Sequence, residues 1–229
     1  MGAIDLSRQL TRYWTGGDGV AHAITMLLLL MSLASWYLIL AKSWSAWRLR
    51  RITGALDAFW SAPGLTDAIA MLRLADPDNI YTPLAARGAD AATQTPPAGS
   101  LDAGSDRADR ITRALRQQIQ RASARLESGL TLLASIGATA PFVGLLGTVW
   151  GLYHALTAIS GTEAVRIDRI AGPVGEALVM TALGLTVAIP AVLAYNAFTR
   201  VNRLTLAGLD AFAHDLQAFL TTGARKETP

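Results

Sequence analysis

The stretch that decides the fold of this chain is Ala134-Ser-Ile-Gly-Ala-Thr-Ala-Pro-Phe-Val-Gly-Leu-Leu-Gly-Thr-Val-Trp-Gly-Leu-Tyr153. It contains no charged side chain, and in the longer segment between Glu127 and Glu163 only His154 can carry a charge near neutral pH. At about 1.5 Å per residue, a helix through this segment is long enough to cross the roughly 30 Å hydrocarbon core of a bilayer. The stretch therefore predicts a membrane-spanning helix, which we place at 128–159.

Two further stretches are also long enough to span a membrane. No charged residue occurs between Asp18 and Lys42, which places a first spanning helix at 20–41. A cleavable signal peptide is the competing interpretation, but the apolar run exceeds a typical one, and tryptophans stand where its small-residue cleavage site should be. A third stretch, at 172–199, contains a single charged residue, Glu176. The sequence therefore predicts an all-α, polytopic membrane protein with three transmembrane helices.

The composition of the whole chain agrees with this class of protein. Of its 229 residues 52% are hydrophobic and only 16% charged, whereas soluble domains have about 25% charged residues. A formal net charge of +3 is too mild to indicate a nucleic-acid partner. The absence of cysteine excludes disulfides and thiolate metal sites. Since no metal-ligand cluster, phosphate-binding loop or catalytic triad is evident, we expect no metal, no cofactor and no enzymatic activity.

Lysine and arginine are distributed unevenly along the chain. Sixteen of the 20 lie in 42–127 and 200–229, and four lie in 1–19 and 160–171. Positive residues near membrane spans are usually found on the cytoplasmic side. We therefore expect 42–127 and 200–229 to be cytoplasmic, with the N-terminal segment 1–19 and the short hairpin loop 160–171 on the outer side.

The segment between the first and second spans divides by composition. Residues 44–74 have a helical pattern that we expect to be interrupted at Gly54 and at Pro63-Gly64. Residues 88–104 are rich in Ala, Gly, Pro, Thr and Asp, which is typical of a flexible loop.

The helices of the second and third spans should extend into the cytoplasm. From Ser105, a candidate N-cap, a polar helix runs without an evident breaker into the second span, which predicts one helix of about 50 residues. The third span should likewise continue, because 201–220 keeps apolar residues at mostly helical spacings.

Small residues gather along one side of the second and third predicted spans. At about 100° per residue, those of the second fall within an arc of about 100° and those of the third within about 80°. They are Gly137, Ala140, Gly144, Gly147, Thr148, Gly151 and Ala155 in the second span and Ala177, Thr181, Gly184, Ala188 and Ala191 in the third. Such stripes let backbones approach closely. We expect these helices to pack tightly against each other or against copies of themselves.

Glu176 is the most informative residue of the chain. An ionisable side chain in a membrane helix is costly and usually faces protein, water or a transported ion. A carboxylate partly withdrawn from water can also exchange protons near neutral pH. The alternative is an interfacial acid, because Glu176 lies only four residues past Gly172, where the predicted span begins.

Thr148 and Thr181 lie on the two stripes of small residues, so their hydroxyls can line a polar track with Glu176 if these stripes face a lumen. Each has an ordinary alternative, a hydrogen bond to the carbonyl four residues earlier in its own helix. Thr181 also stands about 140° from Glu176 around an ideal helix. The pair therefore need not share a face within one subunit, and neighbouring copies can bring the two residues together.

Arg121 and Arg125 lie near the membrane end of the arginine-bearing helix that precedes the second span. They can hold anionic lipid or pair with acids of a neighbour, or they belong to a solvated face. His154 is interpreted as an interfacial anchor.

The run quoted first, together with Gly172-Pro-Val-Gly-Glu-Ala-Leu178 and Ala188-Ile-Pro-Ala-Val-Leu-Ala-Tyr-Asn196, closely resembles the MotA/TolQ/ExbB proton-channel family, and within it the ExbB branch. The similarity is near-literal over about residues 126–203. The layout of three spans with an outer N-terminus extends it to the whole chain, although 1–17 and 88–104 carry no matching motif.

This resemblance implies a homopentameric ring in the inner membrane of a Gram-negative bacterium, which makes the outer side the periplasm. The ring would enclose the single-span helices of an ExbD-like dimer and associate with a TonB-like protein. Proton flow through it would energise outer-membrane uptake of siderophores, haem or vitamin B12. Glu176, Thr148 and Thr181 would line the proton pathway, and the other proton carrier would be an Asp of the ExbD-like helix.

Two alternatives stay open. A TolQ-like subunit would serve the Tol-Pal envelope machinery, with TolR and TolA, by the same mechanism. A non-conducting membrane scaffold would only assemble its partners, with Glu176 in a structural contact, and the stripes of small residues fit that role equally well.

Overall fold

In the computed structural model of the chain, four stretches are described: 19–49, 52–94, 106–157 and 168–223. Every secondary-structure element within them is an α-helix. Three helical stretches, which contain α2, α7 and α8, are long and apolar enough to cross a membrane. The prediction of an all-α protein with three candidate membrane-spanning helices is thereby confirmed.

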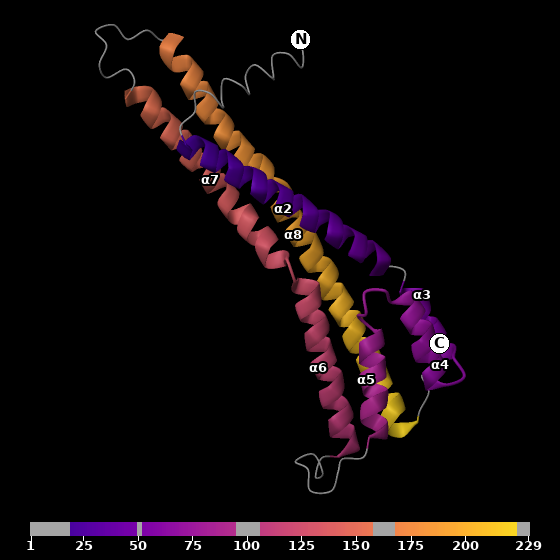
Figure 1. Ribbon diagram of the computed structural model, residues 1–229. Coiled ribbons are helices and arrows are strands. Elements are labelled where there is room, and N and C mark those ends of the chain that lie inside the picture. Colours follow the sequence, from indigo (N-terminus) through magenta and orange to yellow (C-terminus); the bar gives the residue numbers. More distant parts are fainter. Residues whose placement is uncertain (1–18, 50–51, 95–105, 158–167, 224–229) are drawn as a thin grey trace. The chain divides into compact units, whose positions relative to one another are not determined.

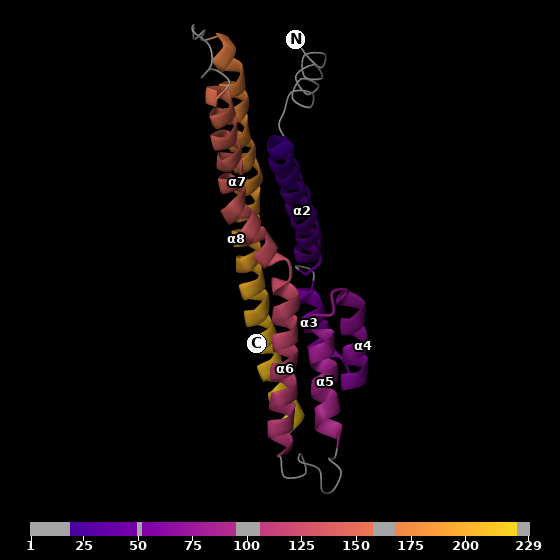
Figure 2. The same ribbon diagram turned by 60° about the vertical axis from the view of Figure 1, so that its left-hand side comes forward.

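The helices form two compact units, and the first consists of α7 (Leu130–Thr157) with parts of α2 (Gly19–Leu49) and α8 (Asp168–Thr222). In this unit α2 extends to Leu40 and α8 to Asn196. Figures 1 and 2 show α7 and α8 side by side. Both are apolar around most of their circumference, as expected of helices surrounded by lipid and by other helices.

The second unit contains α3 (Thr53–Ser61), α4 (Leu65–Ala75), α5 (Thr82–Thr93) and α6 (Arg107–Glu127), together with the last turns of α2 and the second half of α8. In both ribbon views α5 lies beside α6 (Figures 1 and 2). The connection between α4 and α5 lies beside the last turns of α2 (Figure 1).

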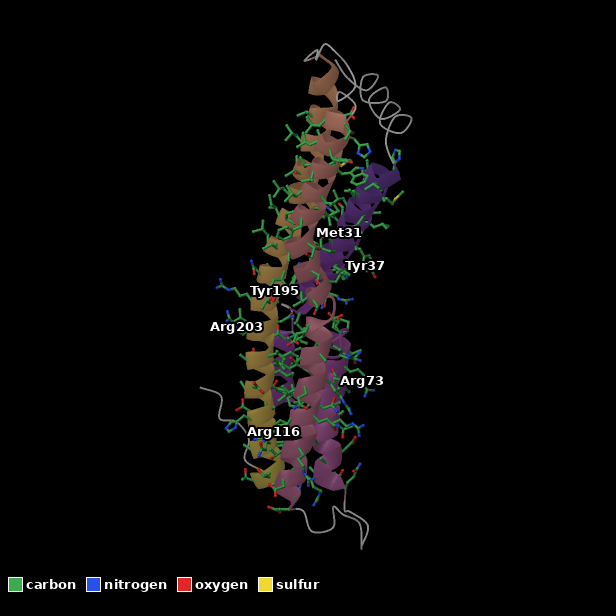
Figure 3. All side chains as sticks on the ribbon, turned by 90° about the vertical axis from the view of Figure 1, so that its left-hand side faces the viewer. Met31, Tyr37, Arg73, Arg116, Tyr195 and Arg203 are labelled. Atoms are coloured by element: carbon green, nitrogen blue, oxygen red, sulfur yellow. The ribbon has the colours of Figure 1, made fainter. Side chains whose placement is uncertain are left out.

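An amphipathic pattern along α6 builds much of the core of the second unit. Its buried residues are spaced three or four apart, which places them on one side of the helix: Ile111, Leu115, Gln118, Ala122 and Leu126. Arg113 and Arg116 lie on the opposite, exposed side. In this unit Arg116 of α6, Arg73 of α4 and Arg203 of α8 all project outward (Figure 3).

An aromatic cluster joins α3 to α8 within this core. The ring of Phe59 makes edge-to-face contacts with Phe212 and Trp60, at centroid distances of 5.1 and 5.2 Å. Tyr81 adds a third edge-to-face contact to Phe212 at 5.8 Å. Such pairs contribute about 0.5–1.5 kcal/mol each beyond the area that they bury.

We predicted one continuous helix from the polar segment into the second span. This prediction is wrong at one point. α6 ends at Glu127 and α7 begins at Leu130, and Gly129 between them has a φ of 79°. Only glycine adopts this left-handed conformation without a steric penalty. The neighbouring α2 also comes close, since a Cβ on Gly129 would lie 2.9 Å from Cδ2 of Leu38.

The carbonyls at the end of α6 receive hydrogen bonds from side chains of α2 and α8 and from the residue that caps α6. Lys42 Nζ and Asn202 Nδ2 each donate to the carbonyl oxygen of Leu126, both at 2.7 Å. Ser128 Oγ donates to the carbonyl oxygen of Arg125, also at 2.7 Å. These bonds compensate for the helical partners that the last carbonyls lack.

Two glycines interpreted as breakers lie inside helices. Gly54 belongs to α3, and the interruption comes just before that helix, whereas Pro63-Gly64 does separate α3 from α4. Gly88, the expected start of a flexible loop, lies within α5. A Cβ at this position would lie 3.0 Å from Cδ2 of Leu115, so the glycine lets α5 approach α6 closely. The rest of that expected loop, from 95 on, lies outside the described residues, as does Ser105.

The third apolar helix continues well beyond the length that a membrane requires. α8 is one helix of 55 residues, and it remains helical through Pro190 and as far as Thr222. Its first half belongs to the first unit and its second half to the second. The expected continuation of the helix through 201–220 is therefore present.

Candidate functional site

α7 and α8 approach each other closely at two glycines. A Cβ on Gly144 would lie 2.6 Å from the carbonyl oxygen of Met180, and one on Gly184 would lie 2.6 Å from that of Ala140. The Cα atom of each glycine is 3.1 Å from the position of the other's added Cβ. Because the obstructing atoms are backbone, no side-chain rotation relieves such contacts, and glycine is what permits this separation.

Other residues of the two stripes lie along the same contact. A Cβ on Gly151 would lie 2.9 Å from the Cβ of Ala177, and one on Gly147 would lie 3.0 Å from the Cβ of Met180. The remaining members of the expected packing set are also buried: Gly137 and Ala188.

The two candidate threonines meet between the close-packed helices. The Thr148 hydroxyl is hydrogen-bonded to the Thr181 hydroxyl. It also lies 3.2 Å from the carbonyl oxygen of Gly144 in its own helix and 3.1 Å from that of Ala177 in α8. Thr148 is 8% exposed. The intrahelical bond that was the ordinary alternative is thus present, and the hydroxyl reaches the facing helix as well.

Glu176 is not brought into contact with the threonines. It directly precedes Ala177 in α8, but its side chain is exposed on the single chain. Within the part of the chain that the structure describes, its carboxylate makes no hydrogen bond or ion pair. This separation agrees with the angle of about 140° expected between Glu176 and Thr181 on one helix.

The chemistry that this site can perform depends on which of its side chains can ionise. A threonine hydroxyl donates and accepts hydrogen bonds but does not ionise near neutral pH. From Val174 to Asn196, Glu176 is the only carboxylate in the sequence. The site therefore combines one ionisable acid with a pair of hydroxyls between the two helices, and proton exchange by that acid needs a second acid or base.

Sequence reasoning treated His154 as a lone residue, and the structure shows that it belongs to an aromatic cluster. Its ring lies 4.9 Å from that of Trp150 and 5.5 Å from that of Tyr153. The spacing of four between Trp150 and His154 was the available signal, since such residues are neighbours on a helix.

Arg121 and Arg125 are both exposed. Arg125 Nη1 donates a hydrogen bond to the carbonyl oxygen of Asn79, at 3.3 Å, so part of its role is to contact the α4–α5 connection. Lipid binding by this pair stays a prediction. Among the residues that the structure describes, no group of three or more side chains could hold a metal ion.

Comparison with known proteins identifies the family. The family model described as the MotA/TolQ/ExbB proton channel family matches residues 79–210. A biopolymer transport protein ExbB of Xanthomonas campestris pv. campestris is 46% identical over 215 residues, which cover 92% of this chain and 85% of that protein. An ExbB of Neisseria meningitidis is 39% identical over 210 residues, 89% of this chain and 93% of that protein.

A Tol-Pal system protein TolQ of Pseudomonas aeruginosa is also similar, with 31% identity over 209 residues, 88% of this chain and 87% of that protein. The resemblance inferred from the sequence motifs is thus confirmed. The family is one of proton channels in membranes, not a family of enzymes. The three apolar helices and the extent of these matches show that the chain belongs to the MotA/TolQ/ExbB proton channel family.

Proposed function

We propose that the chain is the ring-forming subunit of an ExbB-type proton channel, which uses the proton motive force to energise outer-membrane uptake through a TonB-like protein. The transported nutrients would be siderophores, haem or vitamin B12. The observation that carries this proposal is the hydroxyl pair of Thr148 and Thr181 between α7 and α8, in which Thr181 stands five residues along α8 from the carboxylate of Glu176.

In this mechanism Glu176 exchanges protons with an Asp on an ExbD-like helix. Its side chain is exposed on the single chain, so a guest helix or a neighbouring copy can reach it. The hydroxyls of Thr148 and Thr181 would line the same pathway, further along the two helices. A carboxylate exposed to bulk lipid would be costly, which favours an assembly that covers it.

We propose that the assembly is a homopentamer in the inner membrane, which encloses an ExbD-like dimer. The N-terminal segment 1–19 and the connector 160–171 would be periplasmic. The segments 42–127 and 200–229 would be cytoplasmic, so that the second and third spans extend into the cytoplasm. The bias of lysine and arginine supports this orientation.

A TolQ-like role is the second candidate within the family. The 31% identity to a TolQ over most of both chains supports it, but identities of 46% and 39% to ExbB proteins favour the TonB system. The scaffold role is the remaining alternative. The two glycines Gly144 and Gly184 support it as well as they support a channel, because close packing serves both.

Substitution Glu176→Gln separates the channel from the scaffold. The variant keeps the size of the side chain and one acceptor oxygen, and it removes the ionisation. In cells that supply ExbD-like and TonB-like partners, we expect the ring to assemble and siderophore uptake to fall to the level without the chain. The matched control is Glu127→Gln, whose carboxylate at the end of α6 accepts a bond from Ser123 and lies outside the proposed pathway.

Uptake at the wild-type level in an assembled Glu176→Gln ring would leave the scaffold as the better explanation. If Glu176→Gln prevents assembly, Glu176→Asp provides the second measurement, because it retains an ionisable group. Restored assembly with partial uptake would then support the proton pathway, and restored assembly without any uptake would count against it.

A further inference from the structure

The last turn of α4 exposes large apolar side chains in the second unit. Leu74 is 89% exposed and Met71 is 50% exposed, whereas Leu72 between them is fully buried. On the last turns of α2, Trp44 and Trp47 are 62% and 50% exposed, and their ring centroids lie 5.7 Å apart. We call Trp44, Trp47, Met71 and Leu74 the exposed apolar patch.

Hydrogen bonds hold the connection between α4 and α5 against the end of α2. Ser45 Oγ donates to Oδ2 of Asp78 at 2.9 Å, and Arg48 forms an ion pair with the other oxygen of the same carboxylate. The α4–α5 connection therefore lies at the level of Ser45 and Arg48 along α2 (Figure 1).

The position of Ser45 relative to the bilayer follows from the sequence. Lys42 is the first charged residue after Asp18, so the hydrocarbon core ends near Lys42. Ser45 follows three residues later, about 5 Å further along the helix axis. The headgroup region adds roughly 5–8 Å on each side of the hydrocarbon. The α4–α5 connection is thus at the depth of the lipid headgroups.

The acidic groups of this connection are turned inward. The carboxylate of Asp76 is 1% exposed and accepts three backbone N–H bonds, from Ile80 at 3.0 Å, Tyr81 at 2.8 Å and Thr82 at 2.7 Å. Asp78 is paired with Arg48. Leu74 is exposed just before this connection, beside Arg73, which projects outward (Figure 3), and Pro77 and Asn79 are the exposed residues of the connection itself.

The two tryptophans of the patch lie on the helix that also contains the first apolar span. Leu33, Tyr37 and Leu40 are exposed on α2, and with Trp44 and Trp47 they are spaced three or four residues apart, on one side of the helix. Tryptophan is enriched where hydrocarbon meets headgroups. Exposed leucine with neighbouring arginine is the combination by which interfacial helices bind anionic leaflets.

We propose that the exposed apolar patch rests in the headgroup layer of the adjacent leaflet, with Leu74 inserted below the headgroups and Arg73 among lipid phosphates. α4 is then a membrane-surface anchor of the second unit, distinct from the three spanning helices. This inference does not depend on the proton pathway, because it involves neither Glu176 nor the threonines.

The natural absence of cysteine makes a site-specific test direct. The variant Leu74→Cys would carry a polarity-sensitive fluorophore in full-length protein reconstituted into phosphatidylcholine–phosphatidylglycerol vesicles. Thr66→Cys, an exposed position at the opposite end of α4, is the matched control. We expect blue-shifted emission at 74, and quenching by lipids spin-labelled near the headgroup that is at least about threefold stronger than at 66.

Met71→Cys provides a second position on the same side of α4 and should give intermediate quenching. Because Leu74 and Thr66 are exposed, the labelled proteins should elute from a sizing column as the unlabelled chain does. Equal quenching at 66 and 74 would overturn the proposal. So would protection at 74 that appears only when ExbD-like or TonB-like partners are added, since the patch would then be a protein-docking surface.

Discussion

At the scale of single residues, the Thr148 hydroxyl has partners in its own helix and in the facing helix. Its hydroxyl bonds its own helix at Gly144 and crosses to Thr181 and Ala177 of α8. The first bond is local, and a net contribution of about 0.5–1.5 kcal/mol is typical of such bonds. The contacts with Thr181 and Ala177 place a polar group between two apolar helices. The proposed proton pathway needs such a group there.

Thr148→Val removes the hydroxyl and keeps the shape of the side chain, so we expect the assembly to persist and the proton-driven uptake to fall severalfold without being lost. Thr148→Ser retains the hydroxyl and should restore most of that uptake. The measurement is the rate of siderophore uptake per assembled ring. Equal rates in the Val and Ser variants would mean that the hydroxyl has no part in proton transfer.

At the scale of secondary-structure elements, the α7–α8 contact depends on backbone approach at Gly144 and Gly184. At each of these glycines, an added methyl carbon would lie 2.6 Å from a carbonyl oxygen of the facing helix. At Gly147 the nearest atom is a side-chain carbon of Met180, at 3.0 Å. Overpacking of this kind costs roughly 1–3 kcal/mol, and more where the obstructing atom cannot move.

Gly144→Ala should therefore force the two helices apart and lower the thermal stability of the protein in detergent, measured as the midpoint of the loss of the folded peak on a sizing column. Gly175→Ala is the matched control, since nothing lies within 4 Å of a Cβ there. The control should be neutral or slightly stabilising because alanine favours helix. A Gly144→Ala protein as stable as the control would show that α7 and α8 do not need this close approach.

At the scale of the whole molecule, the single chain leaves much apolar surface uncovered. Large side chains of the first unit are more than half exposed on both α7 and α8: Phe142, Leu145, Leu146, Val149, Tyr153, Leu156, Leu178, Val179, Ile189 and Leu193. Lipid can cover part of this surface, and neighbouring copies can cover the rest, as the proposed ring requires.

Native mass spectrometry of the purified protein should show a pentamer, whose mass is five times that of the 24.3 kDa chain. We expect an additional mass of two single-span partners when the ExbD-like protein is co-expressed. The Gly175→Ala variant should give the same pentamer, because within its own chain the added methyl meets nothing within 4 Å. A dominant monomer or dimer in several mild detergents would contradict the proposed ring.

Much of the architecture could be predicted from the sequence, because the cost of placing charge in hydrocarbon is local. A segment such as 134–153 without a charged residue forms a helix in lipid whatever surrounds it. The stripes of small residues were evident for a similar reason, since helical periodicity alone places Gly144 and Thr148 on one side. The family motifs lie in these same segments.

The rest depends on contacts between residues distant in the sequence. The break after α6 comes at Gly129, where Leu38 of another helix leaves no room for a side chain and where Lys42 and Asn202 bond the last carbonyl of α6. Gly88 stays within α5 because α6 packs against it. No local pattern distinguishes these glycines from one another, since their conformations follow from packing. The spacing of residues determined that Thr148 and Glu176 lie on membrane helices, and only the tertiary structure decided which hydroxyl meets which carbonyl, because that depends on how far apart two helices pack.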